Sequence, residues 1–203
     1  MDPVEVGVIH GVPCTAADRA IFDASRWAPN VREAVVVIDM AVAARLASLH
    51  QVRRYAETKA GWAGVQQVRD ALGLATERSR SPAESRLRLL WTLDAGLPQP
   101  LVNWPVADSR GRFLAEVDLL DPAAGLVGEY DGADHRSGAR HARDVRREDA
   151  LRRVGLELVT VTGRDLASPG MVKDRILSAR ERAARIPPAS KTFLIKVAPK
   201  PVR

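Results

Sequence analysis

Apolar and polar residues alternate most clearly between residues 113 and 131. From Phe113 to Leu120, and again from Leu126 to Asp131, the pattern has a period of two, which is typical of half-buried strands. The segment between them, Asp-Pro-Ala-Ala-Gly at 121–125, has the composition of a turn. The pattern therefore predicts a hairpin in which side chains alternate between two faces.

This hairpin is expected to bring two acidic side chains together. On the first strand, one face is predicted to carry Phe113, Ala115, Val117 and Leu119, and the other Glu116 and Asp118. On the second strand Val127, Glu129 and Asp131 share a face. An ordinary turn would place Asp118 opposite Glu129, at about 5 Å. Because like charges repel there, we expect a cation between them or a raised pKa on one of them.

The elements around the hairpin predict an α/β domain. A helix is expected at 82–95, a strand at 100–107, a helix at 139–154, a strand at 156–162 and a helix at 169–186. With the hairpin, the order is αβββαβα, which makes a mixed sheet flanked by helices. The segment 189–203 is basic and contains a short apolar stretch, so it is either an edge strand or a mobile basic tail.

The region 1–76 is predicted to be small and mostly helical. A strand or extended arm at 4–13 precedes helices at about 16–27, 31–49, 50–59 and 62–72. Thr15 is a suitable N-cap for the first helix, and Gly73 a suitable end for the last. The β-branched run Val35–Ile38 could instead be a strand. The polar stretch 76–81 is the expected boundary before a second domain at 81–188.

Composition narrows the class of partner. The formal net charge is +6 and the isoelectric point is about 10.1, which favours an anionic partner, DNA first. The single cysteine, Cys14, excludes an internal disulfide and fits a reducing cytoplasm. The sequence has no apolar run approaching the roughly 20 residues that span a bilayer, so no membrane association is expected.

Several ordered motifs resemble a known nuclease family. They are Ser-Pro-x-Glu-Ser-Arg at 81–86, Gly-Leu-Pro-x-Pro at 96–100, Val-Asp-Leu at 117–119 and Glu-Tyr-Asp-Gly at 129–132, followed by His135, Asp144, Arg147, Leu151 and Gly155. Together they resemble the very-short-patch-repair-like endonuclease domain of the PD-(D/E)xK superfamily, over residues 81–166. The resemblance implies a restriction-endonuclease-like fold. Residues 15–26 are similar to the helical segment that precedes this domain in actinobacterial fusions with AbiEi-like antitoxins.

The resemblance implies phosphodiester hydrolysis with a divalent metal, Mg²⁺ or Mn²⁺, held by Asp118 and Glu129. Magnesium prefers oxygen ligands and keeps several waters, so two or three carboxylates suffice. Asp131 or the Leu119 carbonyl could supply a further oxygen. Asp131 also stands where the superfamily usually has a lysine, and no lysine occurs between Lys59 and Lys173.

A histidine takes part just downstream in the repair-endonuclease branch, and His135 occupies that position. It could relay a proton or contact phosphate, since its unperturbed pKa is about 6.5. Glu84 has two interpretations that are compatible with each other. The resemblance places it at the active-site edge, whereas its spacing from Ser81 is that of a capping box.

Arginines on the helix at 139–154 are mostly explained by a solvated, salt-bridged face. Arg147, together with Arg143 and Arg136, is the better candidate for phosphate contact because it lies near the acidic hairpin. Asp144 is expected to orient Arg147 or His135.

Three functions remain open from the sequence. The first is a metal-dependent DNA endonuclease. The second is a catalytically inactive nuclease-like protein that binds DNA or has an antitoxin or regulatory role. The third is a role for residues 1–76 in binding a toxin or another protein, or a second copy of the chain.

Overall fold

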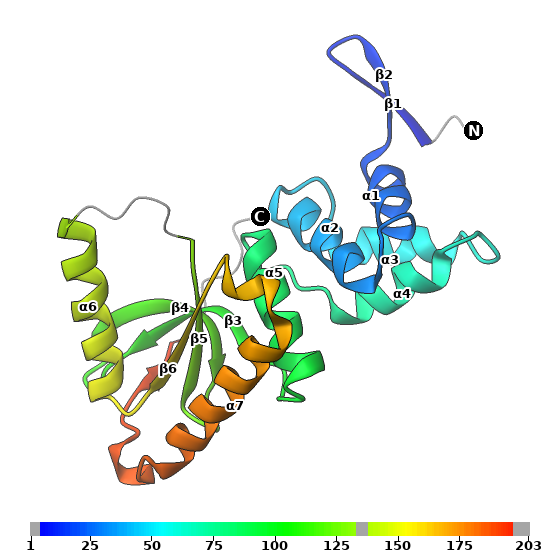
Figure 1. The fold of residues 1–203 in the computed structure, drawn as a ribbon. Coiled ribbons are helices and arrows are strands. Elements are labelled where there is room, and N and C mark those ends of the chain that lie inside the picture. Colours follow the sequence, from blue (N-terminus) through cyan, green and yellow to red (C-terminus); the bar gives the residue numbers. More distant parts are fainter. Residues whose placement is uncertain (1–4, 133–137, 197–203) are drawn as a thin grey trace. The chain divides into compact units, whose positions relative to one another are not determined.

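The computed structural model describes residues 5–132 and 138–196, without the side chains of residues 9 and 138–142. The chain forms two compact units, Met1–Ser85 and Arg86–Arg203, whose elements are labelled in Figure 1. The division falls within helix α5 (Pro82–Leu89), a few residues beyond the polar stretch at 76–81. Each unit has its own core and is described by itself.

The first unit is a bundle of four helices that carries a hairpin. The helices are α1 (Ala17–Arg26), α2 (Val31–Ala43), α3 (Leu49–Glu57) and α4 (Val65–Leu74). Each contributes a fully buried side chain to the core, namely Phe22, Ile38, Val52 and Val68. The hairpin of β1 (Val6–Ile9) and β2 (Val12–Thr15) extends away from the helices (Figure 1).

Three local predictions for this unit are wrong. Thr15 belongs to β2, and the N-cap of α1 is Ala16, which makes no side-chain cap hydrogen bond. A second strand, β2, follows β1 where an arm ending near Pro13 was expected. Gly73 lies inside α4, which continues to Leu74.

The β-branched run at 35–38 is helical, because its Val35, Val36 and Ile38 side chains are buried within the bundle.

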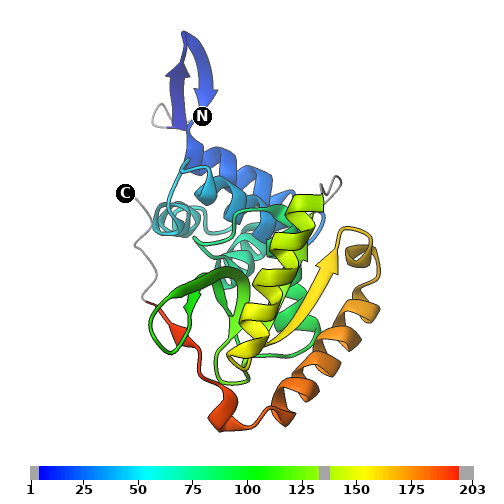
Figure 2. The ribbon, with the colours of Figure 1, turned by 90° about the vertical axis from the view of Figure 1, so that its left-hand side faces the viewer.

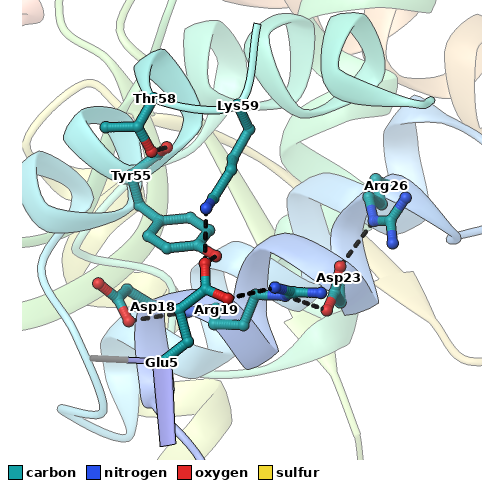
Figure 3. Close-up of polar contacts among 8 residues, drawn as sticks. All are labelled: Glu5, Asp18, Arg19, Asp23, Arg26, Tyr55, Thr58 and Lys59. Carbon is teal, nitrogen blue, oxygen red and sulfur yellow. Dashed lines mark hydrogen bonds and ion pairs between the residues drawn. The ribbon is translucent and has the colours of Figure 1, made fainter. Parts of the chain in front are cut away.

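A cluster around the Glu5 carboxylate attaches the hairpin to the helices (Figure 3). Lys59 donates to Oε1 at 2.5 Å and the Tyr55 hydroxyl to the same oxygen at 2.6 Å, while Arg19 donates to Oε2 at 2.7 Å. Hydrogen bonds from Lys59 and Tyr55 lower the pKa of Glu5 to about 2. Since Ala16 N–H also donates to the Glu5 carbonyl at 2.8 Å, both the backbone and the side chain of Glu5 fix the base of the hairpin.

The second unit has the predicted element order. After α5, which continues as a π-helical turn at Leu90–Asp94, come β3 (Leu101–Ala107), β4 (Phe113–Asp121) and β5 (Leu126–Asp131). Helix α6 (Gly138–Arg153), β6 (Glu157–Thr162) and α7 (Pro169–Arg185) follow. The order αβββαβα is thus observed, and the open choice at the C-terminal end is resolved as a short strand, β7 (Leu194–Ile195).

The five strands form one mixed sheet with helices on both faces. Its order is β6-β5-β4-β3-β7, with β5 and β6 parallel and the other neighbours antiparallel. One core cluster joins the sheet to α5, the π-helical turn and α7, through residues such as Trp91, Leu119 and Ile176. The other cluster joins the opposite face to α6, through Val117, Val127 and Leu151. Figure 2 shows α6 (yellow-green) lying across that face of the sheet.

The alternation of β4 is interrupted at Asp118. Ala115 and Val117 pack in the cluster under α6, whereas Leu119 packs in the opposite cluster with α7. The prediction that Leu119 shares their face is therefore wrong. The cause lies in the partner strand, where Asn103, between the pairs Val102↔Leu119 and Trp104↔Val117, has a left-handed φ of +48°. The strand pair changes phase at this point, next to Asp118.

The segment after α7 is held in place around Gly155. Gly155 has a φ of +83°, and a Cβ there would collide with the Ser190 carbonyl. Thr192 N–H donates to the Val154 carbonyl at 2.9 Å, and Lys191 Nζ donates to the Ala124 carbonyl at 2.7 Å. These contacts lead the chain to β7, which pairs with β3 through Val106↔Ile195.

Within the described residues, none of the helices combines the length and the apolar character needed to cross a membrane.

Candidate active site on strands β4 and β5

The β4–β5 ladder has the register predicted for the acidic pair. The last backbone pair on this side is Leu119↔Gly128, and the same register continued by one position would set Asp118 against Glu129. Here the Asp118 side chain enters the strand pairing, because Tyr130 N–H donates to Asp118 Oδ2 at 2.7 Å. This hydrogen bond fixes the Asp118 carboxylate beside β5, one residue from Glu129.

Glu129 is held from the other side by helix α6. Arg147 Nη1 donates to Glu129 Oε2 at 2.9 Å, and Arg147 Nη2 donates to Oε1 at 3.0 Å. Arg147 Nη2 also donates to the Glu116 carbonyl of β4 at 2.6 Å. The guanidinium thus links α6, β4 and β5 in a bidentate geometry that is among the stronger charge-assisted arrangements.

Of the outcomes expected for two neighbouring acids, a raised pKa is found on Glu129, and its main cause is burial. Burial raises the pKa of Glu129 from 4.5 to about 7, and this effect outweighs the hydrogen bonds and charge of Arg147, which lower it. The negative charge of Asp118 contributes a further rise. The Glu129 side chain is 13% exposed. The structure therefore has a cation against Glu129 and a raised pKa on that residue.

Asp144 was expected to orient Arg147 or His135. Arg147 pairs with Glu129 instead, and His135 lies outside the described residues. Burial acts to lower the pKa of Arg147, but the hydrogen bond and charge of Glu129 raise it overall. Asp144 is exposed and adds only a smaller electrostatic effect. The prediction that Arg147 lies near the acidic hairpin is confirmed, and its partner there is Glu129.

None of the other predicted site residues takes part in the hydrogen bonds described above for Asp118, Glu129 and Arg147. Asp131 ends β5 opposite Thr162 of β6, and Arg143 is exposed on α6. His135 and Arg136 lie outside the described residues. Glu84 belongs to the first unit and caps α5. Its N–H donates to Ser81 Oγ at 3.2 Å, so the predicted N-cap by Ser81 is confirmed. Its carboxylate accepts from Arg80 N–H at 2.9 Å, one residue before the N-cap.

The acidic pair offers oxygen atoms, the donor type that a hard divalent cation prefers. Asp118 and Glu129 offer carboxylate oxygens, and magnesium completes its octahedron with water. The described residues include no group of three or more His, Cys, Asp or Glu side chains placed to hold a metal. Both Glu129 oxygens already accept hydrogen bonds from Arg147. The pair fits such an ion by its chemistry, while the charge of Glu129 is balanced by α6.

Two features of the site were not anticipated from the sequence. One is the backbone donor Tyr130 N–H, which no residue pattern reveals. The other is the partner of Arg147, which was expected to contact phosphate and instead binds Glu129. A signal for it existed, because Arg147 precedes the buried residues Leu151 and Val154 by four and seven positions, which places all three on one helix face.

Comparison with known proteins places the chain in no family: no family model matches it, and no curated protein or solved structure matches it either.

Proposed function

We propose that residues 86–203 form a divalent-metal-dependent endonuclease domain that hydrolyses phosphodiester bonds of DNA. The observation that carries this proposal is the position of Asp118 and Glu129 on neighbouring strands, close enough for one charge to raise the pKa of the other. Holding two carboxylates close together in a folded protein costs free energy, because their charges repel. Such pairs with a raised pKa are found often in cation-binding and catalytic sites.

The topology supports the proposal. An antiparallel β3-β4-β5 meander is followed by α6 and a parallel β6, with α5 and α7 on the other face. This is the arrangement that the resemblance to the PD-(D/E)xK superfamily leads us to expect, with both acids on the second and third strands. The net charge of +6 favours a polyanionic substrate.

Each residue of the site has a distinct role in the proposal. Asp118 and Glu129 would hold the metal, and Tyr130 N–H keeps the Asp118 carboxylate oriented. When bound, a divalent metal polarises a phosphoryl oxygen and acidifies water. Arg147 orients Glu129 through two hydrogen bonds. Asp131 and His135 are the candidates to move a proton, because no lysine stands at position 131.

Plasmid nicking by the purified chain tests this function. With Mg²⁺ or Mn²⁺, the wild type should convert supercoiled DNA to the nicked form, and Asp118→Asn and Glu129→Gln should each abolish that conversion. Asp149→Asn is the matched control, since Asp149 is an exposed carboxylate on α6. Intact plasmid with the wild type, across nicked, mismatched and single-stranded substrates as well, would refute the proposal.

A specific observation favours a second candidate, a catalytically inactive nuclease-like protein that binds DNA. Arg147 neutralises Glu129 through both of its oxygens, and the superfamily lysine is replaced by Asp131. This candidate predicts salt-dependent retention on DNA that survives both carboxylate substitutions. Loss of retention at low salt would exclude it.

A further inference from the structure

Helix α6 carries several arginines, but Arg147 is in a different environment from Arg152. Arg147 contacts the acidic pair and the β4 backbone, and its side chain is 35% exposed. Arg152 pairs instead with Glu148 and Glu157 and is 43% exposed. Arg147 is thus the arginine of α6 whose charge is directed at Glu129.

Arg147 donates three hydrogen bonds through the two terminal nitrogens of its guanidinium. Two go to the oxygens of Glu129, at 2.9 and 3.0 Å, and one goes to the Glu116 carbonyl at 2.6 Å. A cation approaching Glu129 would meet a positive charge already hydrogen-bonded to both oxygens.

From this geometry we propose that Arg147 is the resident counter-ion of the acidic pair, and that a divalent cation competes with it for the Glu129 carboxylate. The proposal rests on the proposed function, because it takes Asp118 and Glu129 as the ligands of the cation. Arg147 is then a positioning residue: it keeps Glu129 in place without the ion and yields at least one oxygen when the ion binds.

The effect of Arg147 on the affinity for Mg²⁺ can be estimated. A charge within about 4–6 Å commonly changes the affinity of a group for a cation by about tenfold or more. Removing the guanidinium should therefore strengthen binding of Mg²⁺ by about tenfold, provided that the carboxylate remains in place. A side chain that only packs α6 against the sheet would give no such gain.

Calorimetric titration with Mg²⁺ alone tests this inference, at about pH 8.5 so that protons do not compete at the carboxylates. Arg147→Met keeps much of the aliphatic stem and removes the charge, whereas Arg147→Lys keeps the charge. Arg147→Met should bind Mg²⁺ about tenfold more tightly than the wild type, and Arg147→Lys should stay near the wild type. Arg152→Met, a change at an ion-paired arginine on the same helix, is the control and should leave the Kd unchanged.

A second measurement needs no substitution in the titrated protein. The Nε–Hε resonance of Arg147, assigned by its absence from the Arg147→Lys spectrum, should shift as Mg²⁺ is added to the wild type. This measurement decides the question if Arg147→Met does not fold.

The outcomes separate this inference from the proposed function. If the wild type binds Mg²⁺ and Glu129→Gln abolishes binding, but Arg147→Met binds no more tightly, the competition is refuted and the metal site stands. A resonance that stays fixed while Mg²⁺ binds leads to the same conclusion. Absence of binding by the wild type and by a folded Arg147→Met refutes both.

Discussion

Replacing Arg147 by methionine should destabilise the protein by an amount that grows with pH. The pKa of Glu129 rises from 4.5 to about 7 on folding, which corresponds to a cost of about 3 kcal/mol for the ionised form at high pH. Because the folded state binds the proton more tightly, this group stabilises the fold at low pH. That stability is lost as the pH rises from 4.5 through the folded pKa.

Arg147 limits this loss in the wild type. The hydrogen bonds and charge of Arg147 lower the pKa of Glu129, so without Arg147 that pKa should rise further above its usual range. At about pH 6 Glu129 is protonated in both folded proteins, and the variant loses only packing and the hydrogen bond to Glu116. At about pH 8.5 the variant should lose about 1–2 kcal/mol more than at pH 6.

Urea denaturation at the two pH values measures both free energies of unfolding. The same comparison in a Glu129→Gln background provides the control, because a neutral side chain there should remove the pH dependence of the substitution. An equal destabilisation at both pH values would refute the reasoning. So would a pH dependence that persists in the Glu129→Gln background, since the ionisation would then belong to another group.

Three further predictions concern the fold. Glu5→Gln should increase hydrogen exchange of the β1–β2 amides while leaving α1–α4 protected, because it removes the charge that holds the hairpin base; unchanged exchange would show that the backbone contacts suffice. Gly155→Ala should lower stability by about 1–3 kcal/mol in urea denaturation, from its left-handed φ and the collision with Ser190, whereas Gly170→Ala, which meets nothing within 4 Å, should be close to neutral. Asn103→Val should lower the melting temperature more than Asn103→Gly, because a β-branched residue is strained at a φ of +48°; the opposite ranking would contradict the strain argument.

The sequence predicted the elements of the second unit because their patterns are long and bounded by clear signals. The sequences of β4 and β5 alternate between apolar and polar residues over most of their length, and α7 begins at Pro169, the position where proline is favoured. The second hairpin strand, β2, was missed because its four residues include Pro13 and show no alternation. Gly73 was predicted to end the helix because glycine often does so. In the structure α4 extends to Leu74, since the packing of the buried Leu72 stabilises its last turn.

The candidate site was predictable only in part. Register follows from turn length and alternation, so the relation of Asp118 to Glu129 could be inferred. The change of phase beside Asp118 could not, because it depends on one left-handed residue, Asn103, in a different strand. The partner of Glu129 depends on which face of α6 meets the sheet. Because arginines occur all around α6, the face that meets the sheet can be predicted only from the few buried residues, Leu151 and Val154.

The short strand β7 shields the sheet. On this side β3 would otherwise present unpaired backbone groups to solvent, and such strands invite other chains to pair with them. The shield depends on a distant glycine, since Gly155 leaves the room in which residues 190–192 turn towards β3. A substitution at Gly155 should therefore cause the protein to self-associate while its second unit is still folded.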